Sequence, residues 1–237
     1  MSYLGQRILA VVPARGGSKG IAKKNLRRVG GLSLVARAAS LIKEIDWIDR
    51  SVISTDDVEI HREGVHFGLS SIGTRPADLS TDTANSIDVW RQAWDAAQEK
   101  YGETYQLSIL LEPTCPLRIV DDIERVVFSI VEEKFSSAVT VSENPERFAP
   151  EKTLKIAKGK NLYHYLNSEH ALTRRQEVPR YFHRNGACYG AIKSRLFEGG
   201  EIFGEGCAAV VLSRPLVNID SMEDLRFART LFRSLKD

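Results

Sequence analysis

The stretch from Arg7 to Asn25 constrains this chain more than any other, because an apolar segment there runs directly into a cationic, glycine-rich loop. Ile8–Val12 is a short run of small and β-branched residues stopped by Pro13, which predicts a strand buried on both faces. Three glycines in the loop are interspersed with four cations, Arg15, Lys19, Lys23 and Lys24. Such a backbone turns tightly and presents its N–H groups at close range, which predicts a polyphosphate site.

The spacing of the glycines excludes two common phosphate loops. A P-loop needs a second glycine five residues after the first, followed by Lys and Ser or Thr, and neither Gly16 nor Gly17 has one. A dinucleotide fingerprint needs Gly-x-Gly, but the residue two after Gly16 is Ser18. The sequence therefore argues against a P-loop enzyme and against a dinucleotide-dependent oxidoreductase.

Composition limits the size, partners and location of the protein. A chain of 237 residues buries one sizeable core, so we expect a single domain over residues 1–237. The net charge of only +2 disfavours nucleic acid as a partner, and three cysteines without C-x-x-C spacing disfavour disulfides and zinc. The N-terminus lacks an apolar leader, and no run approaches the ~18 residues of a membrane span. We expect a cytoplasmic protein without membrane contact.

Apolar strands alternate with amphipathic helices along most of the chain, which predicts an α/β fold. The expected strands are Ile8–Val12, Arg50–Ser54, Gln106–Leu111, Ser137–Val141 and Ala208–Leu212. Helices are expected after Gly31, from Ser86 to Tyr101, from Ile119 to Lys134 and after Ser221. Residues 142–184 break this rhythm, and such a long irregular segment is unusual inside a compact domain.

Two polar segments each allow two interpretations. Thr55-Asp56-Asp57 follows the second strand and is either a helix cap or the edge of a nucleotide site. The segment 75–86 precedes a helix, and Ser80, Thr81 and Thr83 are expected to cap it. Arg75 is then either a surface residue or part of a pocket.

The loop also carries the signature of a known family. Its pattern, A-R-x-x-S-K-G followed by K-N, resembles that of the sugar cytidylyltransferases that make CMP-activated nonulosonic acids, the CMP-sialic acid synthetases and their relatives. Further motifs follow in the family's order at 75–86, 113–118 and 185–220. The resemblance implies a three-layer α/β/α Rossmann-like nucleotidyltransferase fold with a mostly parallel sheet. It also implies that residues 142–184 form an inserted extension that covers the sugar site of a second subunit in a homodimer.

The resemblance implies transfer of CMP from CTP to the anomeric hydroxyl of a nonulosonic acid, with pyrophosphate as the second product and Mg²⁺ as cofactor. The implied catalytic residues are Arg15, Lys19, Lys24 and Asp220. The implied nucleotide contacts are Ala14, Arg15, Ser18, Lys24, Asn25, Arg75, Ala84 and Ser86. Asp220 is expected to bind the metal, with Asn218 in a weaker role because the family usually carries aspartate there.

The resemblance also implies a set of sugar contacts: Glu112, Lys152, Arg175, Asn185, Tyr189, Ile202 and Phe203. Glu112 stands where the family usually has glutamine, and an ionised carboxylate only accepts hydrogen bonds. His183 likewise departs from the family's pattern. These differences leave the acceptor open among neuraminate, legionaminate, pseudaminate and deaminated sugars.

Two alternatives to this function stay open. A 3-deoxyoctulosonate cytidylyltransferase (CMP-3-deoxyoctulosonate synthetase) would share the chemistry, although its family usually carries R-x-x-S-T-R in the first loop. A non-catalytic module would bind CTP without releasing pyrophosphate.

Overall fold

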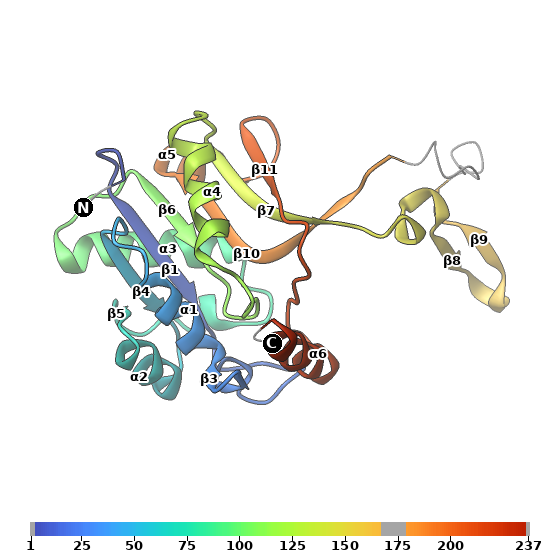
Figure 1. Ribbon diagram of the computed structural model, residues 1–237, viewed down its shortest axis with the longest axis horizontal. Helices are drawn as coiled ribbons and strands as arrows, with labels where there is room; N and C mark the ends of the chain where they lie inside the picture. The colour runs from blue at the N-terminus through green and yellow to red at the C-terminus, as the bar shows by residue number, and fades with distance from the viewer. Residues whose placement is uncertain (1–2, 167–178, 236–237) are drawn as a thin grey trace.

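The computed structural model describes residues 3–166 and 179–235, and a seven-stranded sheet lies at its centre (Figure 1). The strand order is β11-β7-β10-β6-β1-β4-β5. Strand β10 is antiparallel to both of its neighbours, whereas the other pairs are parallel. The expected mostly parallel sheet is confirmed. The strands are β1 (Ile8–Pro13), β4 (Arg50–Ser54), β5 (Ser70–Ser71), β6 (Leu107–Leu110), β7 (Ser137–Glu143), β10 (Phe182–Ile192) and β11 (Cys207–Val211).

Helices cover both faces of this sheet. They are α1 (Leu34–Ile42), α2 (Val58–His66), α3 (Ser86–Tyr101), α4 (Val120–Val131) and α5 (Lys193–Glu198). Helix α6 (Met222–Ser234) packs beside the sheet instead, against Ile21, Val29 and Leu117. Alternate residues of β1 point to opposite faces: Ile8, Ala10 and Val12 pack with α1, α2 and α4, whereas Leu9 and Val11 pack with α3 and α5. This alternation produces the three layers that the family resemblance implied. Among the described residues, no helix combines the length and apolarity needed to cross a membrane.

Side-chain caps fix where the helices begin. The Asp57 carboxylate accepts hydrogen bonds from the backbone of Glu59 and Ile60 and so starts α2. Helix α3 begins after Asn85, whose Oδ1 accepts from the Ile87 N–H at 2.9 Å. The prediction that Ser80, Thr81 and Thr83 cap this helix was wrong, because Asn85 stands directly before it and a separate 3₁₀ helix, η2 (Asp78–Ser80), takes up the preceding residues.

The described part of residues 142–184, where strands and helices stop alternating, projects from the body of the molecule (Figure 1). Strands β7 and β10 pair outward as far as Glu143 and Phe182. Beyond them lie a hairpin and short 3₁₀ helices: β8 (Leu154–Ile156), β9 (Leu162–His164), η3 (Glu146–Phe148), η4 (Pro150–Lys152) and η5 (Lys158–Lys160). Near the N-terminus, three small elements lie at and after the end of the cationic loop: η1 (Lys24–Leu26), β2 (Arg28–Val29) and β3 (Leu32–Ser33).

Candidate active site

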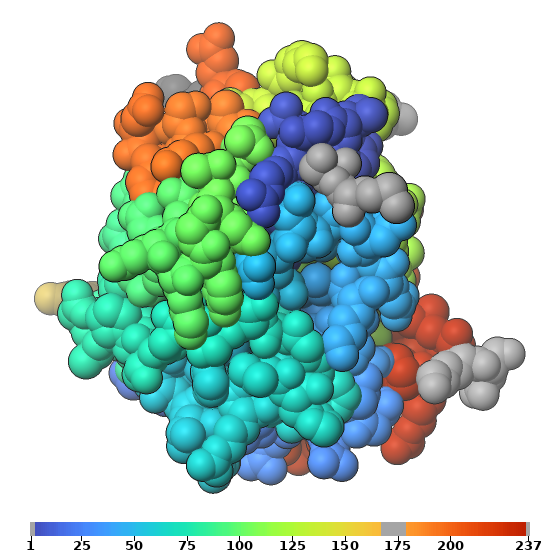
Figure 2. Space-filling view, turned by 90° about the vertical axis from the view of Figure 1, so that its left-hand side faces the viewer, coloured from blue at the N-terminus to red at the C-terminus, as the bar shows by residue number. Residues whose placement is uncertain are grey.

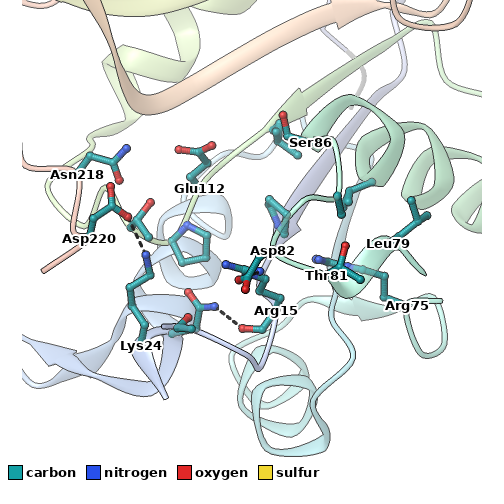
Figure 3. Close-up of a pocket in the computed structure, with 18 residues that line it drawn as sticks. Arg15, Lys24, Arg75, Leu79, Thr81, Asp82, Ser86, Glu112, Asn218 and Asp220 are labelled. Atoms are coloured by element: carbon teal, nitrogen blue, oxygen red, sulfur yellow. Dashed lines mark hydrogen bonds and ion pairs between the residues drawn. The ribbon is translucent and has the colours of Figure 1, made fainter. Parts of the chain in front are cut away.

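Four segments distant in sequence line one cavity of about 390 Å³ at the carboxyl ends of the parallel strands (Figure 3). They are the loop after β1, the segment before α3, the loop after β6 and the segment before α6. Strand β1 pairs with β4 on one side and with β6 on the other, so the strand order reverses direction at β1. Ligands of open α/β sheets bind at such a switch point. This first cavity gathers ten of the predicted residues, Arg15, Ser18, Lys24, Asn25, Arg75, Ala84, Ser86, Glu112, Asn218 and Asp220.

The cationic loop lies against the segment before α6. Lys24 Nζ donates to the Ile219 carbonyl at 3.0 Å and to Asp220 Oδ1 at 2.9 Å (Figure 3). A Cβ atom on Gly20 would stand only 2.3 Å from the Asp220 carbonyl oxygen, so only glycine permits this approach. The predicted phosphate loop and the predicted metal ligand therefore share one cleft.

Two further hydrogen bonds hold the start of the loop. Asn25 Nδ2 donates to the Arg15 carbonyl at 3.0 Å, and the Gly16 N–H donates to Asp56 Oδ1 at 2.9 Å. The segment Thr55-Asp56-Asp57 thus has two roles, since Asp57 caps α2 while its neighbour fixes the loop. Backbone N–H groups on the loop are thereby held in place before any ligand arrives.

Arg75 is buried in the wall of the first cavity, with only 6% of its surface exposed. Its Nε donates to Ser54 Oγ at 3.0 Å and its Nη2 to the Ser54 carbonyl. Burial lowers the pKa of the guanidinium to about 10. The interpretation of Arg75 as a surface residue was wrong, and the buried cation faces the cavity from the segment before α3.

Sequence reasoning missed Asp82, which lies in the first cavity beside Arg15 (Figure 3). Its Oδ1 is 2.5 Å from Arg15 Nη1, and its Oδ2 is 2.5 Å from Lys19 Nζ. The hydrogen bond from Lys19 is the main cause that holds the pKa of Asp82 below its usual range, and the hydrogen bond from Arg15 adds to it. Lys19 does not line the cavity, and its side chain is 83% exposed. One signal could have found Asp82: it is an acidic residue in a segment that the resemblance placed at the same nucleotide as the cationic loop.

A second cavity of about 240 Å³ adjoins the first and shares three lining residues with it, Ser86, Leu110 and Glu112. Its other walls hold three of the predicted sugar contacts, Tyr189, Ile202 and Phe203. Arg184 also lines it, with its guanidinium carbon 5.3 Å from the centre of the Phe203 ring. The two cavities together form one site, with the cationic loop in one part and Tyr189, Ile202 and Phe203 in the other.

Glu112 lines both cavities and so stands where they meet. Figure 3 shows it in the first cavity, between Asn218 and Ser86. Burial raises the pKa of its carboxyl group, and the charge of Asp220 acts in the same direction, while Arg118 and Arg184 oppose it. The backbone carbonyl of Glu112 accepts from Arg118, which also donates to the Gly186 carbonyl at 3.0 Å. Arg118 therefore fixes the loop after β6 against β10.

Several predicted residues lie elsewhere. Ala14 is buried in the core beside the loop. Lys152 forms an ion pair with Glu146 in the projecting extension and lines neither cavity. Asn185 is buried, and its amide bonds to Thr140 and Ser142. Arg175 lies outside the described residues. His183 pairs with Asn144 at 2.6 Å and also lines neither cavity. The roles of these residues stay predictions.

A family model described as cytidylyltransferase matches residues 9–203. The chain belongs to this family. It is 29% identical over 228 residues to the pseudaminic acid cytidylyltransferase of Campylobacter jejuni serotype O:2, covering 95% of this chain and 96% of that protein. It is 29% identical over 231 residues to the CMP-N,N'-diacetyllegionaminic acid synthase of the same organism, covering 97% and 96%.

A solved structure of this cytidylyltransferase's fold is that of CMP:2-keto-3-deoxy-manno-octonic acid synthetase complexed with CTP. The TM-score is 0.70 at 16% identity, and the match covers 96% of this chain and 99% of that one. At this identity the likeness concerns the fold, and it confirms the Rossmann-like nucleotidyltransferase architecture expected from the sequence. The family expected from the loop signature is confirmed as well.

Proposed function

We propose that this cytidylyltransferase transfers CMP from CTP to the anomeric hydroxyl of a nonulosonic acid and releases pyrophosphate. The observation that carries the proposal is the pair of adjoining cavities, one lined by the cationic loop and the other by Tyr189, Ile202 and Phe203. A nucleotide in the first cavity and a sugar in the second would meet at Glu112. The names of the two Campylobacter relatives support a nonulosonic acid as the acceptor.

The reaction needs charge neutralisation above all. When a sugar hydroxyl attacks the α-phosphorus in line, negative charge gathers on the α-phosphate and on the departing pyrophosphate. Arg15 and Lys24 line the first cavity and would bind these oxygens, with Lys19 at the rim. Fixed cations of this kind stabilise the transition state without reorganising during the reaction.

The opposite wall of the first cavity would bind the cytidine. Arg75, Ala84 and Ser86 line it from the segment before α3. A wall with fixed polar groups rejects a base that leaves those groups without partners, because an unpaired buried group is costly. Arg75 is already held by Ser54, so its orientation does not depend on the ligand.

We also propose that Mg²⁺ binds between the phosphates and the segment before α6. Asp220 would hold it through its carboxylate, with the amide of Asn218 nearby in the same cavity wall. Among the described residues, no three His, Cys, Asp or Glu side chains form a cluster suited to a metal. A sparse donor set fits Mg²⁺, which keeps much of its water and takes substrate phosphates as ligands. When bound, this ion would neutralise charge on the phosphates.

Arg184 is the described arginine best placed for the carboxylate of the acceptor. It lines the second cavity together with Glu112, and a planar guanidinium binds a carboxylate through two parallel hydrogen bonds. Phe203 and Ile202 would then pack against an apolar substituent of the sugar. The sugar-contact role expected for Lys152, which lines neither cavity, would require a second subunit.

The homodimer is the third part of the proposal. The projecting hairpin exposes apolar side chains, including Leu154 at 48%, Ile156 at 77% and Leu162 at 61% exposure. An apolar surface of this kind usually marks an interface. A second copy of the chain would cover it and bring its own extension to the sugar site. The cytoplasmic location expected from the sequence stays a prediction.

The test is release of pyrophosphate from CTP in the presence of Mg²⁺ and a panel of acceptors: neuraminate, legionaminate, pseudaminate, a deaminated nonulosonate and 3-deoxyoctulosonate. We expect turnover with at least one nonulosonate, and its loss in Lys24→Ala and in Asp220→Ala with the fold intact. Turnover of 3-deoxyoctulosonate alone would favour that acceptor. Binding of CTP without release under any condition would favour a non-catalytic module.

A further inference from the structure

Asp82 is an anion placed inside a site built for anions. Its two carboxylate oxygens divide between two cations of the loop, Arg15 and Lys19, each at 2.5 Å. This is the contact that two phosphate oxygens would make with the same pair. In Figure 3 the carboxylate lies against the Arg15 side chain, on the cavity side of the loop.

The backbone around Asp82 is held only lightly. It lies between η2 and α3, outside the sheet and the helices. The nearest local ties are the Ala84 N–H to the Thr81 carbonyl and the Thr81 hydroxyl to the Asp78 carbonyl, both long at 3.4 Å. The Asp82 side chain is itself 34% exposed. Nothing in these contacts prevents the carboxylate from leaving the loop when a stronger anion arrives.

A triphosphate and the Asp82 carboxylate compete for the charges of Arg15 and Lys19. Partly exposed ion pairs contribute little to stability because water and salt screen them, so a polyanion displaces a single carboxylate readily. The other cations that line this cavity are Lys24, which already pairs with Asp220, and Arg75, which is bonded to Ser54. Arg15 and Lys19 are the two loop cations that Asp82 holds, so they are the ones for which CTP and Asp82 compete.

We propose that Asp82 is a displaceable internal anion: its carboxylate closes the cationic loop in the absence of nucleotide, yields to the phosphates of CTP, and returns as pyrophosphate leaves. The inference rests on the proposed function, since it takes the first cavity as the phosphate site. Its consequence is kinetic as well as energetic. By competing for Arg15 and Lys19, Asp82 weakens binding of CTP and of pyrophosphate, and it thereby speeds product release.

The test compares Asp82→Asn with the wild type by titration calorimetry at low ionic strength, with CTP, inorganic pyrophosphate and cytidine as separate ligands. The amide keeps the size of the side chain and removes its charge. We expect CTP and pyrophosphate to bind about threefold to tenfold more tightly to the variant, from the loss of two partly exposed ion pairs. Cytidine, which lacks phosphates, should bind equally, and added salt should shrink the difference.

Asp78→Asn is the matched control, because it removes the same charge from the same segment. Asp78 is exposed, does not line the cavity and forms no ion pair within the described residues. We expect it to bind all three ligands as the wild type does. In turnover, Asp82→Asn should show a lower KM for CTP and stronger inhibition by pyrophosphate. An unchanged melting temperature checks that the variant is folded, and Asp82→Ala provides a second charge deletion.

The outcomes separate this inference from the proposed function. Tighter phosphate binding by both Asp82 variants supports the internal anion. Equal or weaker binding of CTP and pyrophosphate, with normal binding to the wild type, means that Asp82 only orients the loop, so the inference fails while the proposed function stands. If neither the wild type nor the variants bind CTP, the inference and the proposed function both fail.

Discussion

At the scale of single residues, Glu112 distinguishes this chain from the pattern its family usually shows. A carboxylate replaces an amide at the junction of two cavities, and its neighbours include a second carboxylate, Asp220. Burial makes the ionised form of Glu112 costly, which is why its pKa is raised. We therefore propose that Glu112 helps to determine which sugar is accepted.

Glu112→Gln should therefore change the acceptor and the stability together. We expect the ranking of acceptors in the pyrophosphate assay to shift, while the Kd for CTP stays within about twofold because the triphosphate contacts are untouched. The ligand-free variant should be more stable at neutral pH by about 1 kcal/mol, since it no longer buries a charge. Because a raised pKa favours the protonated folded state, this gain should vanish in acid.

Chemical denaturation at neutral and acid pH measures this difference. Glu205→Gln, at an exposed position, is the control and should leave stability unchanged. An unaltered acceptor ranking in Glu112→Gln would show that Glu112 does not contact the sugar.

The residue scale also shows what the sequence predicts well. The loop signature placed Arg15, Ser18, Lys24 and Asn25 correctly at one cavity, because a family motif preserves local geometry. Asp82 was missed because its role arises from a contact 67 residues away in the chain, with Arg15. Helix-capping rules account for the polar residues of this segment whether or not they also contact another part of the chain, so they give no sign of such a contact.

At the scale of elements, the loop after β1 depends on a close backbone approach. Gly20→Ala places a methyl group 2.3 Å from the Asp220 carbonyl oxygen, which neither backbone can accommodate without moving. We expect the melting temperature to fall, corresponding to about 1–3 kcal/mol, and CTP binding to weaken by at least about tenfold. Gly17→Ala is the matched control for stability, because nothing lies within 4 Å of its added methyl group. Equal melting temperatures for the two variants would contradict this packing.

The amino-terminal end of the sheet is fastened by an ion-pair network around Glu103. Figure 2 shows the dark-blue N-terminal segment beside the light-blue and green segments that hold its partners. Arg50 binds Glu103 through two hydrogen bonds of 2.6 and 2.7 Å, and Arg7 lies 3.3 Å away. Hydrogen bonds from Arg50 are the main cause that lowers the pKa of Glu103 to about 2.

Glu103→Gln should cost about 1–3 kcal/mol of unfolding free energy at neutral pH. Because the folded pKa is depressed, the stabilisation is fully present above the ordinary value of 4.5 and is lost as the pH falls towards about 2. The difference between variant and wild type should therefore shrink across that window in urea unfolding. Glu99→Gln, an exposed neighbour on α3, should show no difference at any pH. A gap independent of pH would exclude this electrostatic origin.

Helices and strands were predicted better than the residues that cap them. Strand β4 and helix α3 have the boundaries expected from periodicity, because apolar spacing reports directly on which residues the core buries. Periodicity carries no information on caps, so Asn85 was overlooked in favour of three hydroxyl residues. Strand β7 leads into the projecting extension and β10 returns from it, so the two strands are antiparallel. The sequence of β10 alone does not indicate this direction.

At the scale of the whole molecule, the projecting hairpin has one apolar face. Leu154, Ile156 and Leu162 lie on that face, because Ile156 pairs with Leu162 and strand residues alternate. His164, which pairs with Leu154, lies at its edge. Lys155 lies on the other face, paired with Tyr163. The sequence showed an irregular segment and the family resemblance implied an extension there, whereas its apolar face becomes visible only when the register is known.

Ile156→Glu should convert the proposed dimer to monomers in analytical ultracentrifugation, because a buried unpaired charge is costly at an interface. We expect acceptor turnover to fall while binding of CTP persists, since the first cavity is complete within one chain. Lys155→Glu, on the opposite face, should remain dimeric. A wild-type protein that sediments as a monomer would refute the dimer.

The most direct measurement is a crystal structure of the protein with CTP and Mg²⁺. We predict that the triphosphate lies on Arg15 and Lys24, that the base lies against Arg75 and Ser86, and that the ion lies between the phosphates and Asp220. CTP bound outside the first cavity, or with its phosphates away from the loop after β1, would contradict this assignment of the site.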